Sequence, residues 1–157
     1  MRVKLFLIFT VLILCIFGGL IVQKELVLKN GKTFYLELRP VDPRSILQGD
    51  YMELRYNIRE NTINPHKEEA VCIVLDQDGV GRYLIESIKE KCIAQGDVWV
   101  KVKKQSHSYR LAPDSFFFQE GHAHLYENAS YAVLKYDGKG AVVLSGLADN
   151  KLQEIKP

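Results

Sequence analysis

The chain has 157 residues, the length of a single domain, and its formal net charge is +2. Arg2 and Lys4 account for the whole excess, because residues 23–157 hold the remaining 19 basic side chains against 19 acidic ones. The densest basic cluster is Lys101, Lys103 and Lys104, a pattern typical of the solvated side of a strand. Nucleic-acid binding needs a basic face, so this neutral composition indicates no nucleic-acid partner.

An uncharged apolar stretch runs from Leu5 to Val22, behind a short basic tip at residues 1–4. As a helix it would be about 27 Å long, close to the hydrocarbon thickness of a lipid bilayer. A signal peptide has the same layout, but Phe17 to Gln23 offers no small-x-small cleavage site. Cys15 follows the bulky Leu14, where a lipoprotein signal needs a small residue. The pattern predicts an uncleaved transmembrane helix over residues 5–22.

The charges that flank this helix predict its orientation. Arg2 and Lys4 precede it, whereas Lys24 and Glu25 cancel each other just after it. Because basic flanks stay in the cytoplasm, we expect a cytoplasmic N-terminus and an exported remainder. Residues 23–32 then form a juxtamembrane linker into which the helix extends by a turn or more, and residues 33–157 form the exported domain.

Two cysteines, Cys72 and Cys92, lie in the exported part, where disulfides can form. Their spacing does not establish that their Cα atoms come within bonding distance. A disulfide and two buried thiols therefore both stay open. Metal binding by this pair is disfavoured, because neither cysteine belongs to a C-x-x-C motif.

Short segments with alternating polarity predict a mainly β domain. In chain order these are Phe34 to Leu38, Tyr51 to Ile58, Ala70 to Leu75, Val80 to Ile85, Val98 to Val102, Tyr131 to Tyr136 and Ala141 to Leu144. The clearest strand places Met52, Leu54, Tyr56 and Ile58 on one face. Turn residues at 76–79 and 137–140 predict two hairpins, and 86–91 is either a helical turn or a loop. We expect a compact antiparallel sheet, curled toward a barrel or sandwich.

A compact motif precedes and opens the clearest strand. Asp42 can accept hydrogen bonds from the turn that Pro43 begins, and Gly49 permits a positive φ where the chain enters the strand. Leu54 and Tyr56 point to one face of the strand and Tyr51 to the other. The motif is therefore a folding signature first. Its residues are Asp42, Pro43, Arg44, Gly49, Asp50, Tyr51, Leu54 and Tyr56.

The run GDYMELRY, residues 49–56, resembles the signature of the GDYXXLXY family at all of its fixed positions. The preceding Val-Asp-Pro-Arg is similar to the family's lead-in. Residues 117–121 and the hairpin from 137 to 147 resemble its later landmarks. The resemblance implies a bacterial protein with an N-terminal membrane anchor, often found alongside polytopic membrane proteins, and it implies no particular reaction.

One segment carries residue types that bind metals. Glu120, His122 and His124 lie at i, i+2 and i+4, so they would share one face of a strand. One carboxylate and two imidazoles can hold zinc or iron, provided that a fourth group closes the site. The alternative is an exposed polar strand face without a metal.

A serine protease is a third alternative. Signal-peptidase-like enzymes also place a proline shortly before Gly-Asp at a strand start, with the nucleophilic serine two residues before that proline. Here Val41 occupies that position, and Ser45 would need a lysine base that the sequence does not locate. No catalytic residue is therefore assigned.

These patterns favour a membrane-anchored accessory or binding module outside the cytoplasm, acting with an integral membrane protein. The second alternative is a metal-binding protein or metal-dependent envelope enzyme built on Glu120, His122 and His124. The third is a degenerate serine protease of the signal-peptidase type.

Overall fold

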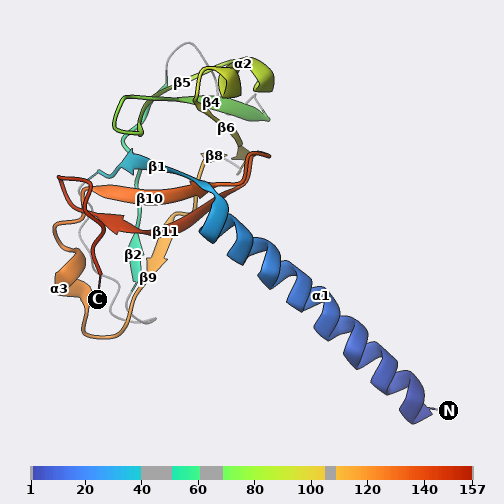
Figure 1. The fold of residues 1–157 in the computed structure, drawn as a ribbon. Helices are drawn as coiled ribbons and strands as arrows, with labels where there is room; N and C mark the ends of the chain where they lie inside the picture. The colour runs from blue at the N-terminus through green and yellow to red at the C-terminus, as the bar shows by residue number, and fades with distance from the viewer. Residues whose placement is uncertain (1, 40–50, 61–68, 105–108, 157) are drawn as a thin grey trace.

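A computed structural model describes residues 2–39, 51–60, 69–104 and 109–156. One long helix leads into a domain made mostly of strands, which confirms the predicted mainly β fold class (Figure 1).

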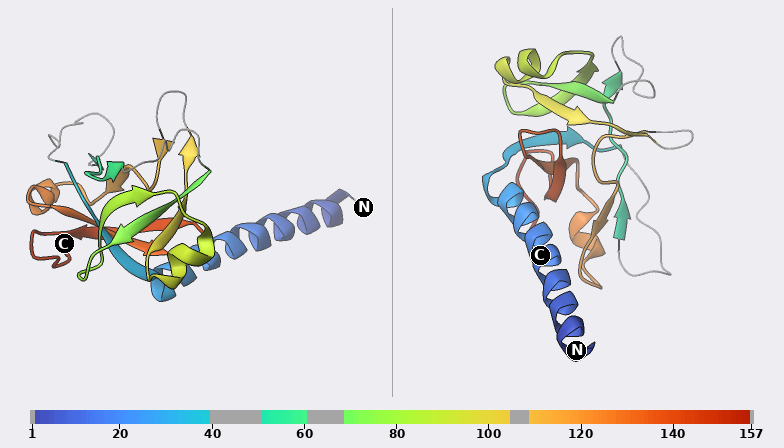
Figure 2. Two further views of the ribbon diagram at one scale, coloured as in Figure 1. Left: turned by 90° about the horizontal axis from the view of Figure 1, so that it is seen from above. Right: turned by 90° about the vertical axis from the view of Figure 1, so that its right-hand side faces the viewer.

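Helix α1 (Arg2–Asn30) projects away from the domain in all three views (Figures 1 and 2). From Lys4 to Leu26 its side chains are exposed, and only Val27 and Leu28 near its end are half-buried. By length and composition this helix can cross a membrane. It runs past Val22 to Asn30, so the expected linker of residues 23–32 is largely helical.

The main sheet is mixed. Its strands are β1 (Lys32–Glu37), β3 (Arg59–Glu60), β4 (Ala70–Leu75), β5 (Val80–Ile85), β6 (Val98–Lys101), β10 (Tyr131–Tyr136) and β11 (Val142–Ala148). They lie in the order β11-β10-β1-β5-β4-β6, with β3 also paired to β5. Both predicted hairpins, β4–β5 and β10–β11, are present.

The sheet is antiparallel, as expected, except at β5. Strand β4 pairs antiparallel with one edge of β5. On the other edge, β1 pairs in parallel with the start of β5, and β3 pairs in parallel with its end. The sheet is curled, so that its two ends approach each other. At the end of β6 the Lys101 N–H donates to the carbonyl of Gly140, in the turn between β10 and β11 (3.0 Å). The sheet does not close into a barrel, since β6 and β11 are not paired.

The clearest predicted strand is also not continuous. Its first part, β2 (Tyr51–Glu53), pairs with β9 (Ser115–Phe117), whereas Tyr56 bridges to Leu38 and β3 joins the main sheet. The chain changes partners within ten residues. The predicted apolar face is correct, because Met52 and Leu54 are buried.

The core lies against the inner face of β1. Phe34 and Leu36 alternate with half-buried neighbours, as the period of two in a strand requires. They belong to one core cluster with side chains from other strands of the sheet that are likewise less than 2% exposed: Leu134, Leu147, Ile73, Leu84, Val98 and Val100.

Short elements complete the fold. Helix α2 (Lys89–Ala94) begins within residues 86–91, the segment left open as helix or loop, and extends beyond it. Helix α3 (Ala123–Tyr126) follows β9, and β7 (Lys103–Lys104) pairs with β8 (Tyr109–Arg110). Of the two alternatives for the cysteines, the structure has the disulfide. Cys72 on β4 and Cys92 on α2 are bonded, with Cα atoms 5.9 Å apart, and both are buried.

Candidate functional site

The described part of the family motif begins at Tyr51. Its earlier residues, Asp42, Pro43, Arg44, Gly49 and Asp50, lie outside the described residues. So do Val41 and Ser45, on which the protease alternative depends. That alternative gains no geometric support.

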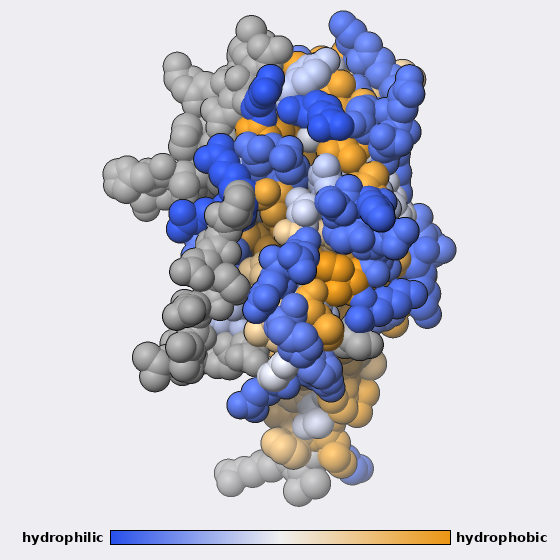
Figure 3. Space-filling view, turned by 90° about the vertical axis from the view of Figure 1, so that its left-hand side faces the viewer, coloured by the Kyte–Doolittle hydropathy of each residue, from blue (hydrophilic) through white to orange (hydrophobic). Residues whose placement is uncertain are grey.

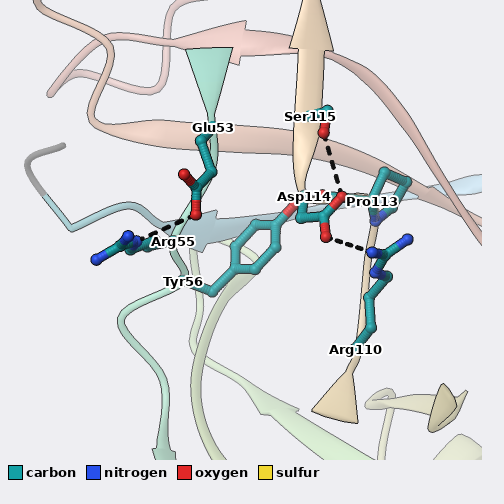
Figure 4. A network of polar contacts seen from close by, with 7 residues as sticks. All are labelled: Glu53, Arg55, Tyr56, Arg110, Pro113, Asp114 and Ser115. Carbon is teal, nitrogen blue, oxygen red and sulfur yellow. Dashed lines mark hydrogen bonds and ion pairs between the residues drawn. The ribbon is translucent and has the colours of Figure 1, made fainter. Parts of the chain in front are cut away.

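Tyr56 ties the motif to the segment before β9. Its hydroxyl donates to the Pro113 carbonyl oxygen (Figure 4). The next residue, Asp114, pairs with Arg110 at 2.5 Å and accepts a hydrogen bond from the Ser115 hydroxyl at 3.2 Å. The last tyrosine of the motif thus anchors a turn that is distant in sequence.

Burial raises the pKa of Tyr56 above its ordinary value, and the nearby Asp114 carboxylate raises it further. The Arg110 guanidinium opposes both effects without cancelling them. The phenol therefore stays protonated and keeps its hydrogen bond to Pro113. A group held in this way serves structure and is unsuited to act as a base near neutral pH.

The other described motif residues also hold β2 against β9. The Leu54 N–H donates to the Asp114 carbonyl at 2.8 Å, which continues the ladder beyond β2. The Tyr51 ring lies 5.7 Å from that of Phe117, and Phe117 is 72% exposed. These are the contacts of a folding motif.

The strand expected through Glu120, His122 and His124 is wrong. Glu120 and Gly121 form a turn, closed by the His122 N–H donating to the Gln119 carbonyl, and His124 lies in α3. Residues two apart on a helical turn point in different directions. His124 Nδ1 lies 3.1 Å from the Gly121 carbonyl oxygen. Within the described ranges no group of three or more His, Cys, Asp or Glu side chains is arranged to hold a metal ion.

A hollow of about 1110 Å³ lies beside the motif. Four segments line it: residues 37–39 at the end of β1, 52–55 in and after β2, 123 with 126–131 in and after α3, and 149–150. Met52, Leu54 and Tyr126 are the buried side chains of its described lining.

Charged side chains line the same hollow. They are four carboxylates, from Glu37, Glu53, Glu127 and Asp149, and two guanidiniums, from Arg39 and Arg55. Glu53 and Arg55 form an ion pair at 3.3 Å (Figure 4). The described lining therefore carries two negative charges in excess, in a domain that is neutral overall.

Sequence reasoning identified the strand that borders the hollow and missed the hollow itself. Glu37, Arg39, Glu127 and Asp149 stand in no motif, and only tertiary pairing brings them together. The one available signal was the charged outer face of the predicted strand, residues 53 and 55.

The comparisons with known proteins agree with the motif. The family model described as GDYXXLXY protein matches residues 13–147, most of the chain. No match was found among curated proteins or solved structures. With the match extending from the apolar helix to the last hairpin, the chain belongs to the GDYXXLXY family.

Proposed function

We propose that this chain is a membrane-anchored accessory module. Its N-terminus would lie in the cytoplasm, and its β domain would act with an integral membrane protein on the outer side of the bacterial cytoplasmic membrane. The observation that carries the proposal is helix α1, whose apolar side chains from Leu5 to Val22 are exposed on every side. Such a surface is stable in lipid and not in water.

The surface of the domain differs from that of the helix. On the face that the space-filling view shows, hydrophilic residues predominate on the domain with apolar residues between them, and apolar α1 emerges below it (Figure 3). This contrast supports a domain in water tethered to a bilayer by α1.

The junction between α1 and β1 supports a partner in the same membrane. The Gly31 N–H donates to the Val27 carbonyl at 2.8 Å, and a Cβ at Gly31 would lie 2.4 Å from that oxygen. Val27 and Leu28 are half-buried near β10 and β11. The helix thus enters the sheet without a flexible linker. The eight residues after Val22 span about 12 Å, which keeps the domain close to the bilayer.

The disulfide supports an exported domain. Bonds such as Cys72–Cys92 persist in oxidising compartments and are rare in the cytoplasm, where thiols are kept reduced.

Crosslinking in intact cells, followed by purification of the full-length protein from solubilised membranes, tests the partnership. We expect at least one integral membrane protein to copurify as a covalent adduct of this chain. The control is the same domain on an unrelated single span, which separates capture by the domain from capture by α1. If no membrane protein is recovered with the native chain, the accessory role loses its basis.

A labelling experiment tests the orientation separately. In a Cys15→Ala background with the disulfide intact, Lys156→Cys should react with a membrane-impermeant maleimide in intact spheroplasts. The matched variant Arg2→Cys should react only after permeabilisation. The reverse pattern would place the domain in the cytoplasm.

A further inference from the structure

We infer that the corner of the sheet where α1 enters it, called the lysine corner here, binds anionic phospholipid headgroups and so seats the domain on the bilayer. The corner carries the side chains of five lysines: Lys29, Lys32, Lys101, Lys135 and Lys139. The inference rests on the proposed function in one respect, that α1 crosses the bilayer. It needs no partner protein.

Three of these lysines surround the junction of α1 with the sheet. Lys29 belongs to the last turn of α1, and Lys32 opens β1 beside the end of β10. On β10, Lys135 lies opposite Thr33, and its ammonium donates to the Thr33 hydroxyl at 2.7 Å. A Cβ at Gly31 would lie 3.3 Å from the Cβ of Lys135, which places Lys135 against the junction. Figure 1 shows the end of α1, the start of β1 and the end of β10 together at this corner.

The other two lysines lie at the turn between β10 and β11. Lys139 is exposed within that turn. Lys101, at the end of β6, donates its backbone N–H to the Gly140 carbonyl at 3.0 Å, and a Cβ at Gly140 would lie 2.8 Å from Lys101 Cγ. Trp99, the only tryptophan of the chain, approaches the same Cβ position to 2.9 Å. Because the turn follows β10 directly, both lysines adjoin the corner.

The positive charge of the corner is not neutralised within the described ranges. There, no carboxylate forms an ion pair with any of the five lysines. The ammonium groups of Lys32 and Lys135 donate to neutral acceptors, the Gly96 carbonyl and a hydroxyl. Two carboxylates adjoin the corner, Asp97 and Asp137, and both accept backbone N–H groups at 2.7 to 3.0 Å. The corner therefore has an excess of three positive charges in a domain that is neutral overall.

Negative charge gathers at the opposite end of β1. Lys32 opens this strand, whereas Glu37 ends it and lines the hollow, whose described lining has two negative charges in excess. A domain polarised in this way turns its lysine corner, and not its hollow, toward an anionic surface.

Helix α1 places the corner at the surface of the bilayer. The seven residues from Val22 to Lys29 rise about 10 Å, and the headgroup layer itself is about 5 to 8 Å thick. Lys24 and Glu25 cancel each other within that layer. Attraction between charges extends over about 8 Å at physiological salt, so lysine side chains at the height of the corner reach the lipid phosphates. The junction without a linker holds the corner at this height.

Lysine reactivity in lipid nanodiscs tests the contact residue by residue. The full-length protein is compared in discs of phosphatidylcholine and in discs that also contain phosphatidylglycerol, and mass spectrometry follows reductive methylation, which needs the neutral amine. Anionic headgroups stabilise the ammonium form, so methylation of Lys29, Lys101 and Lys139 should be about fivefold slower in the anionic discs. High salt should remove the difference. Exposed Lys91 on α2 and Lys151 beyond β11 are internal controls; corner lysines slowed no more than these two overturn the inference.

Energy transfer from Trp99 to dansyl-labelled headgroups measures whether the corner moves toward the bilayer. In the native protein, transfer should rise when phosphatidylglycerol replaces part of the phosphatidylcholine. Lys29→Glu with Lys139→Glu, at two exposed side chains, should abolish the rise. Lys151→Glu with Lys156→Glu makes the same charge change beyond the far end of β11 and should preserve it. An equal rise in the two double variants would sink the assignment to this corner.

Two further controls separate the sources of an effect. Inorganic phosphate, added to phosphatidylcholine discs at matched ionic strength, should leave the lysine rates unchanged, and slowing by phosphate alone would overturn a lipid surface in favour of an anion site. A chain that does not enter the discs would refute the anchor and this inference with it. A chain that enters them but shows no dependence on lipid charge refutes this inference alone. Because no partner protein is present, neither result depends on the accessory role.

Discussion

The two halves of the domain that flank β1 are built differently. The stapled half, comprising β4, β5, β6 and α2, has six-residue strands in its hairpin, a disulfide and a fully buried interior. The motif half, comprising β2, β9 and α3, has three-residue strands and a four-residue helix around a hollow. Dense packing leaves no room for a ligand, whereas the described lining of the motif half encloses a hollow. The contrast teaches that the fold is tightly packed and crosslinked on one side of β1, and built from short elements around a hollow on the other.

Removing the disulfide should lower the stability of the fold more than any other change, since the bond crosslinks β4 and α2 in the stapled half. For cysteines 20 residues apart, we expect Cys72→Ala with Cys92→Ala to lower the free energy of unfolding by about 3 kcal/mol. Denaturation of the full chain in detergent micelles measures the loss. Cys15→Ala, which changes an exposed thiol on α1, is the control. A double variant as stable as that control would contradict a stabilising role for the bridge.

Adding apolar volume to each half sharpens the packing difference. A Cβ at Gly81 would lie 2.6 Å from Leu36 Cδ2 and 2.8 Å from Ile73 Cγ2, both inside the core. We expect Gly81→Ala to lower the free energy of unfolding by about 2 kcal/mol through overpacking. Ala123→Leu, at the lining of the hollow, should change it by only about 0.5 kcal/mol. Melting curves that rank the two variants the other way would refute the proposed contrast.

Within the motif half, the two described tyrosines of the motif should differ. Tyr56→Phe leaves the Pro113 carbonyl without its donor and should cost about 1 kcal/mol of unfolding free energy. Tyr51→Phe keeps the ring contact with Phe117 and should cost little. Chemical denaturation compares them.

The pH dependence of this difference has a definite sign. The pKa of Tyr56 is raised in the folded state, so its stabilisation is complete below the ordinary tyrosine pKa and is lost as pH rises through the folded value. The advantage of the native protein over Tyr56→Phe should therefore shrink in strong alkali. An advantage that grows with pH would contradict the assignment.

The smallest effect should come from the β4–β5 turn. Burial raises the pKa of Asp76, but hydrogen bonds from the Val80 N–H and Arg82 outweigh it and lower the pKa overall. Stabilisation from a lowered carboxyl pKa is present above its ordinary value and lost as pH falls through the folded value. Both partners are partly exposed, so Asp76→Asn should cost about 0.5 kcal/mol at neutral pH and nothing in strong acid. Urea denaturation across this pH range measures it, with Asp78→Asn as the control in the same turn.

Local patterns predicted the elements whose partners are close in sequence. The hairpins β4–β5 and β10–β11 follow from a turn between two apolar runs, which needs no distant contact. The helix is predicted equally well, because length and hydrophobicity alone decide whether it suits a bilayer. The family motif is visible as a run of letters, although its first residues lie outside the described structure.

The same patterns failed to predict the partners of strands that pair with segments far away in the sequence. Alternation from Met52 to Ile58 identified the buried face, because the period of two depends only on the strand. It could not identify the partners, since β2 pairs with β9 while Tyr56 bridges to Leu38. The strand expected at His122 failed for a related reason. A turn with Gly121 at φ +83° interrupts the alternation, and α3 begins just after it.

By itself, the sequence determined the apolar helix, the mainly β character of the domain, its apolar faces and its family, because each is encoded in neighbouring residues. Only the tertiary structure decided the parallel pairing of β1 with β5, the bond between Cys72 and Cys92, and the hollow beside the motif. Each of these depends on backbone segments far apart in the chain coming within a few ångströms of one another. Spacing along a chain does not specify that distance, because it is set by how the whole core packs.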